Sequence, residues 1–222
     1  MKSRQLSTSW VLLLVALLAS AGPARADVIF TVNVNTTPLV GGPFAVAFQL
    51  IDGSGSGDAN NTATISNFTF GGGSASGCPA NCTTTGGASG DMTGTVTMTD
   101  SSFFNTFAEL FTAGTSLSFQ VDLTTNLDAG GTPDAFAFSI LDNGVSIPTL
   151  DPLGADTLLS VDIDAANPAI LTYATDPSRT NISLEAPVIG TPPSSVPAPG
   201  TLLLIITGLA GAVGMGRRKL TE

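Results

Sequence analysis

The sequence predicts an all-β fold: an antiparallel β-sandwich or jelly-roll-like domain with one short helix, flanked by an N-terminal signal peptide and a C-terminal transmembrane helix. Three observations lead to this prediction. Apolar residues alternate with polar ones over short segments, which indicates strands with one buried face. Glycine, serine, threonine and asparagine fill the connections between these segments. Both ends of the 222-residue chain carry an apolar run beside basic residues, unlike the middle.

Residues 1–26 have the pattern of a secretory signal peptide. A short basic region precedes the apolar stretch WVLLLVALL. Ala24 and Ala26 then place small residues at the two positions that signal peptidase reads, so we expect cleavage before Asp27. A buried N-terminal helix is the alternative, but it would not explain the basic flank and the cleavage site together.

Residues 27–186 are predicted to form the exported β-sandwich domain. Alternation marks eight or nine short strands. They are centred on residues 28–34, 44–50, 65–70, 95–99, 117–123, 136–140, 159–164, 171–173 and 182–184. The alternation changes phase between Ile65 and Phe68, which indicates a β-bulge. Strands with one polar face are typical of antiparallel sheets that pack as a sandwich.

One segment instead has helical spacing. Its apolar residues recur at three- and four-residue steps, at Phe103, Phe104, Phe107, Leu110 and Phe111. Serines before this run and Gly114 after it are suitable capping residues. The spacing predicts a short helix that closes one end of the sandwich. We expect its phenylalanines to belong to the core rather than to a ligand site.

Charge is sorted by segment. Between residues 27 and 196 there is one basic residue, Arg179, against sixteen acidic ones, which gives this part a net charge of −15. Such a surface repels nucleic acid and anionic lipid. We therefore expect no nucleic-acid partner and interpret the acidic residues as a solvated surface.

Cys78 and Cys82 are the only cysteines, in the sequence Cys-Pro-Ala-Asn-Cys. Export would place them in an oxidising compartment, which favours a structural disulfide. Zinc is disfavoured because the chain has no histidine and only two thiols. A redox role is disfavoured because no basic residue lies nearby in the sequence. We predict a disulfide, no metal and no cofactor.

Absent residue types restrict the chemistry. The chain has no histidine, and no lysine lies between Lys2 and Lys219. This excludes Ser-His-Asp and Cys-His nucleophiles, and a Schiff base in the exported part. A glycosidase that uses two carboxylates is not excluded, but among sixteen acidic residues some pair meets the required spacing by chance. We predict that the chain is not an enzyme.

A weak calcium signal lies in residues 52–58, DGSGSGD, where oxygen-bearing side chains occupy alternate positions. The remaining aspartates and the final glutamate of a calcium-binding loop are missing. A flexible glycine-rich loop is the preferred interpretation.

The C-terminal end has three parts. Residues 187–199 are rich in proline and are expected to form an extended stalk with a sorting motif at its end. The motif consists of Val196, Pro197, Ala198 and Pro199. Residues 200–216 are uncharged and apolar, as a membrane-entering helix requires. Residues 217–222 form a basic cytoplasmic tail. Its stop signal consists of Arg217, Arg218 and Lys219.

This tail resembles the PEP-CTERM protein-sorting domain, in which Val-Pro-Glu-Pro precedes an apolar helix with Gly-Leu and a run of arginine and lysine. The matching residues are Val196, Pro197, Pro199, Gly208, Leu209, Arg217, Arg218 and Lys219. Ala198 replaces the usual glutamate. Stretches of the exported part, such as Ser66-Asn67-Phe68 and Phe103-Phe104, are also similar to one group of PEP-CTERM proteins without an established activity.

The resemblance implies signal peptidase and an exosortase as partners, and membrane contact through residues 200–216. It implies transit through the inner membrane of a Gram-negative bacterium to the cell surface or the extracellular matrix, in association with exopolysaccharide or biofilm. Whether the tail is cleaved or kept as an anchor stays open. Because most aromatics are expected to face inward, we rank a non-enzymatic structural surface protein first. A carbohydrate- or calcium-binding surface module is the alternative.

Overall fold

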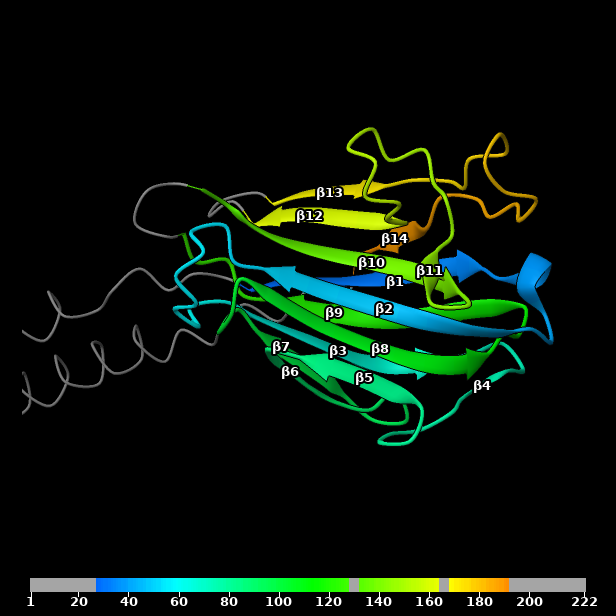
Figure 1. Cartoon of the computed structure of the whole chain (residues 1–222), viewed down its shortest axis with the longest axis horizontal. Coiled ribbons are helices and arrows are strands. Elements are labelled where there is room, and N and C mark those ends of the chain that lie inside the picture. The colour runs from blue at the N-terminus through cyan, green and yellow to red at the C-terminus, as the bar shows by residue number, and fades with distance from the viewer. Residues whose placement is uncertain (1–26, 128–131, 164–167, 192–222) are drawn as a thin grey trace, which may run out of the picture. The chain divides into compact units, whose positions relative to one another are not determined.

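Two antiparallel sheets face each other in the structure (Figure 1). It is a computed structural model that describes residues 27–127, 132–163 and 168–191. The predicted all-β, sandwich-like fold is confirmed for these residues. The predicted signal peptide, apolar segment 200–216 and basic tail 217–222 lie outside them. No helix within the described ranges is long and apolar enough to cross a membrane.

The first sheet is built around the N-terminal strand. Its strands lie in the order β14 (Val188–Gly190), β1 (Val28–Asn35), β9 (Ser116–Leu123), β3 (Thr62–Thr69), β7 (Val96–Thr99) and β6 (Gly87–Gly90). Along β1 and β9 every second side chain is buried, as the alternation predicts. The register of β3 on β9 shifts between Ser66 and Thr69, where Asn67 has a φ of +57°. The predicted bulge is therefore confirmed.

The second sheet contains the longest strands. Its main order is β13 (Ala169–Thr172), β12 (Leu159–Ile163), β10 (Asp134–Asp142), β2 (Pro43–Ile51), β8 (Phe104–Thr112) and β4 (Ser74–Ala75). Two further strands pair with this set: β11 (Val145–Ser146) with β10, and β5 (Cys82–Thr85) with β8. The one helical element of the described chain is a 3₁₀ turn, η1 (Thr37–Leu39).

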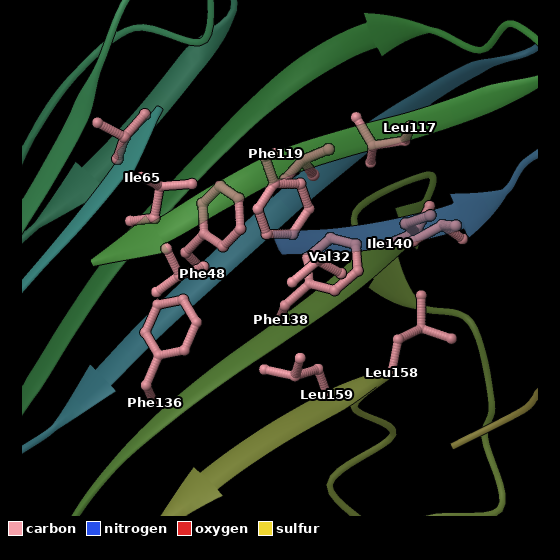
Figure 2. Close-up of a cluster of buried hydrophobic side chains, with 14 of the residues drawn as sticks. Val32, Phe48, Ile65, Leu117, Phe119, Phe136, Phe138, Ile140, Leu158 and Leu159 are labelled. Carbon is pink, nitrogen blue, oxygen red and sulfur yellow. The ribbon is translucent and has the colours of Figure 1, made fainter. Parts of the chain in front are cut away.

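The core between the sheets is aromatic. Phe48 on β2 lies at its centre, with its ring centroid 5.2 Å from that of Phe119 on β9 in an edge-to-face arrangement. Figure 2 shows these two rings pointing toward each other, with Phe136 and Phe138 beside them. Ten of the twelve phenylalanines lie in this core or pack against it. Burial of an apolar side chain of this size contributes about 1.5–3 kcal/mol.

The predicted helix over Phe103–Phe111 is wrong, because this segment is strand β8. Its inward face alternates strictly as Asn105, Phe107, Glu109 and Phe111. Two of these four buried side chains, Asn105 and Glu109, are polar. The apolar residues that remain on this face, Phe107 and Phe111, are four residues apart, which is the spacing of a helix. Phe104 and Leu110 extend the apparent helical pattern, but they face outward.

The end of the domain also differs from the prediction. Residues 182–184 form no strand, although Leu184 is buried and its backbone bonds to Thr175. Beyond Pro187, the predicted first residue of the stalk, the chain adds β14 to the first sheet instead. The folded unit therefore extends to Gly190, past the expected boundary at residue 186.

Candidate functional site

The residues of the sequence-predicted sorting signals lie outside the described part of the chain. This applies to Ala24, Ala26, Val196, Pro197, Ala198, Pro199, Arg217, Arg218 and Lys219. Cys78 and Cys82 are described, and they are joined by a disulfide. Two groups of buried polar residues and one exposed aromatic pair are the candidate sites of the described domain.

The first group lies at the end of the sandwich where β2 and β7 finish and β3 and β10 begin. Asp52, directly after β2, is wholly buried. It accepts hydrogen bonds from the Ser54 hydroxyl and the Gly55 amide, both 2.8 Å long, and from the Gly57 amide. Burial raises the pKa of Asp52, but these hydrogen bonds outweigh it and hold the pKa below its usual value.

These contacts change the interpretation of loop 52–58. Both oxygens of Asp52 point at N–H and O–H donors of its own loop, where a bound calcium ion would need carboxylate and carbonyl oxygens around it. Gly57 has a φ of +65° and packs so close to the Ser101 carbonyl that a Cβ atom would collide with it. The glycines are therefore required by a turn that wraps around Asp52.

Beside this loop, Asp100 and Asp134 lie against each other, and neither is more than 2% exposed. Asn61 links them: its backbone N–H donates to Asp100 at 3.1 Å, and its side-chain amide donates to Asp134 at 2.6 Å. Burial, helped by the hydrogen bond to Asp134 and by its charge, raises the pKa of Asp100 to about 7. This carboxyl pair is closed to a substrate and joins the ends of four strands.

The second group surrounds the disulfide. The Cα atoms of Cys78 and Cys82 are 5.3 Å apart, and Cys82 begins β5 opposite Glu109 on β8. Glu109 is 1% exposed. Its carboxylate accepts hydrogen bonds from the backbone N–H groups of Gly77 and Met92, each 2.8 Å long. Burial raises the pKa of Glu109 against the opposing effect of these amides, and the nearby charge of Asp91 adds to the rise.

Asp91 completes this second group. Its carboxylate accepts hydrogen bonds from the backbone N–H groups of Cys78, at 2.5 Å, and Thr93, at 2.6 Å. The bond from Cys78 is the main cause that lowers the pKa of Asp91. Two carboxylates thus fix the loop that carries the disulfide, one from β8 and one from the turn before β7.

Sequence reasoning missed Glu109 because the segment was interpreted as a helix. The two sulfurs and a Glu109 oxygen lie within 4.8 Å of one another, and within the described residues this is the one group of three side chains with a metal-compatible geometry. The signal that would have found it is the period of two in Asn105, Phe107, Glu109 and Phe111, which places a carboxyl group on the buried face.

The exposed aromatic pair consists of Phe103 and Phe104, which are 50% and 54% exposed. Their ring centroids are 4.5 Å apart in an edge-to-face arrangement. They lie just before and at the start of β8, beside Gly55 of the glycine-rich loop. Among the described residues these are the exposed phenylalanines. The prediction that they belong to the core is therefore wrong.

Comparisons with protein-family models, with curated proteins and with solved structures found no match to this chain.

Proposed function

We propose that this chain is a non-enzymatic exported protein of the cell surface or extracellular matrix. In this proposal signal peptidase removes residues 1–26, and an exosortase of a Gram-negative host recognises the tail that begins at Val196. The β-sandwich is then presented at the surface or released into an exopolysaccharide or biofilm matrix. The tail's order of proline motif, apolar segment and basic cluster supports the sorting step.

One observation carries the proposal: the folded part fits between the two sorting signals. β1 begins at Val28, one residue after the expected new N-terminus at Asp27. β14 ends at Gly190, before the proline motif. Because β14 pairs antiparallel with β1, with Thr31 opposite Gly190, the chain enters and leaves the sandwich at the same end. Such a domain can be tethered by one stalk without losing any strand.

The outer surface of the first sheet supports a structural role. Uncharged polar side chains occupy most of the outward positions of its inner strands. They include Thr31, Ser118, Gln120, Thr64, Ser66, Thr97 and Thr99. With ten phenylalanines in or against the core, this sheet offers no aromatic platform among its described residues.

The test compares the full chain with a variant that ends at Ser195, both expressed in an exosortase-carrying Gram-negative host. We expect the full chain in the surface or matrix fraction, and the truncated chain in the periplasm because it lacks the recognition signal. A host without the exosortase is the control, and there the full chain should stay with the inner membrane. If both chains distribute alike in both hosts, the sorting proposal is wrong.

A carbohydrate-binding function is the second candidate, and the Phe103–Phe104 pair favours it. Exposed aromatic rings at a loop end can stack on the apolar faces of sugar rings. We expect Phe103→Ala with Phe104→Ala to abolish retention on the host's exopolysaccharide if this function exists. Leu153→Ala, at an apolar position that is 88% exposed elsewhere, is the matched control. Unchanged retention of the double variant would contradict this candidate.

A further inference from the structure

We infer that Cys78, Cys82 and Glu109 form a binding site for a thiophilic divalent metal ion, zinc or its analogue cadmium, when the Cys78–Cys82 disulfide is reduced. This site is separate from the proposed surface function. With no histidine and only two thiols, the sequence does not indicate a zinc site, and the fold supplies a third ligand, Glu109.

The three candidate ligand atoms lie close together even while the disulfide is intact. The three lie within 4.8 Å of one another, and Cys78 Sγ is 3.8 Å from Glu109 Oε2. Zinc lies about 2.3 Å from sulfur and about 2.0–2.2 Å from oxygen, so its tetrahedral ligands are roughly 3.5–3.8 Å apart. Once the S–S bond is broken, the two sulfurs can separate to this distance by side-chain rotation. The Cys-x₃-Cys spacing also falls within the range of zinc sites.

Glu109 is held in position to act as a ligand. Each of its carboxylate oxygens accepts one backbone N–H, from Gly77 and from Met92. A carboxylate oxygen has two lone pairs, so one on Oε2 is left for a cation. Hydrogen bonds of this kind orient a ligand and keep it from turning away from the metal.

The charge of the site favours a cation. Among the described residues Arg179 is the one cationic side chain, and it forms an ion pair with Asp156, with N–O distances of 2.7 Å. Glu109 is a buried carboxyl group whose neighbours include another carboxylate, Asp91, and the two sulfurs, besides the two amides that bond to it. Two thiolates and Glu109 together carry three negative charges, which a divalent ion would largely neutralise.

The oxidation state of the sulfurs controls the site. A dithiol reductant gives two electrons and two protons to the disulfide, which becomes two thiols while the reductant forms its own disulfide. Binding of a divalent ion then forms two metal–sulfur bonds and releases both thiol protons to water. A disulfide oxidant reverses these steps and expels the metal as the Cys78–Cys82 bond forms again. Both cysteines are only half-buried, so a reductant can reach them.

The first experiment uses full-length protein, reduced and then freed of the reductant, and titrates it with Cd²⁺ beside the oxidised protein. We expect one equivalent to produce a thiolate-to-cadmium charge-transfer band in the reduced protein and none in the oxidised protein. Addition of oxidised glutathione, followed by removal of the glutathione thiol that forms and of the released cadmium, should then leave the protein without the band. A reduced protein without this band would overturn the inference.

The second experiment tests Glu109. We expect Glu109→Gln to weaken cadmium binding by about tenfold or more, while Asp142→Asn, an exposed carboxylate of β10, leaves the affinity unchanged. Equal affinities of the two variants would overturn the role of Glu109. Because Glu109→Gln alters a packed interior, X-ray absorption on the zinc-loaded wild-type protein provides a readout without substitution. Two sulfur neighbours with oxygen support the site, and a shell without protein sulfur overturns it.

Discussion

Asn61 donates its side-chain amide to Asp134 across 2.6 Å, and through this contact β3 is fixed to the start of β10 on the opposite sheet. The same residue donates its backbone N–H to Asp100. One asparagine therefore spans a pair of buried carboxyl groups at the end of the sandwich. This pair makes the stability of the domain depend on pH.

The free energy of unfolding should fall as the pH rises from about 4 to about 7. Burial and Asp134 raise the pKa of Asp100 from 3.8 to about 7, so in this window the folded state holds a proton that the unfolded state has lost. The stabilisation is complete below pH 4 and is lost as the pH passes 7, at no more than about 1.4 kcal/mol per pH unit.

Urea denaturation of the wild-type protein and of Asp100→Asn across this range measures the effect. The variant cannot take up the proton and should show a shallower slope than the wild-type protein. The same slope in both proteins would show that Asp100 titrates normally. Asp142→Asn, an exposed carboxylate, should keep the wild-type slope.

Replacement of the central ring should be costly. Phe48 is fully buried and contacts the rings of Phe119, Phe136 and Phe138. We expect Phe48→Ala to lower the free energy of unfolding by about 3–5 kcal/mol. The matched control is Phe104→Ala, at a half-exposed ring, which should change it by less than about 0.5 kcal/mol. Chemical denaturation of both variants checks the difference, and similar losses would contradict the described core.

The domain boundary can be tested with two fragments. Residues 27–190 should fold alone as an all-β domain, with a far-UV circular dichroism spectrum that lacks a helical component. Residues 27–186 lack β14, which leaves the backbone of β1 unpaired at the sheet edge and Ile189 missing from its place against the core. We expect the shorter fragment to be less stable by roughly 1–3 kcal/mol. Equal stability would show that β14 contributes nothing.

The mature protein from an exosortase-carrying host should lack Arg217–Lys219 and end near Val196–Thr201. The 17 residues from Gly200 to Gly216 would span about 25 Å as a helix, which is short for a bilayer core of roughly 30 Å. The five glycines of this segment weaken that helix further. Such a segment suits transient insertion better than permanent anchoring. Intact-mass measurement of surface-extracted protein decides between them: a chain ending at Glu222 would support the anchor.

Much of the fold could be predicted because most of its strands bury mainly apolar residues. β2 is an example: Val46, Phe48 and Leu50 on one face specify a strand without further information. Even the bulge at Asn67 is visible as a change of phase between two apolar runs. The local sequence pattern is sufficient to predict a strand where its inward side chains are apolar and pack against the core.

β8 could not be predicted because the partners of its buried polar residues come from distant parts of the chain. Asn105 donates to the Leu50 carbonyl at 3.0 Å and accepts the Gly87 amide at 2.8 Å. Glu109 depends on Gly77 and Met92 in the same way. The period of two in β8 places Glu109 on a buried face, but these distant contacts, and the disulfide beside Glu109, become evident only from the fold. β6, with two glycines in four residues, looks like a loop until it pairs with β7.

The pairing of β14 with β1 has a mechanical consequence. Tension applied at Gly190 along the axis of β14 would act parallel to the pairing of this strand with β1. With the far end of the sandwich held, the load would fall on all the hydrogen bonds between β14 and β1 at once instead of opening them singly. The aligned residues are only three, Val188 to Gly190. Under pulling force we expect this short strand to detach first, lengthening the tether while the aromatic core stays folded.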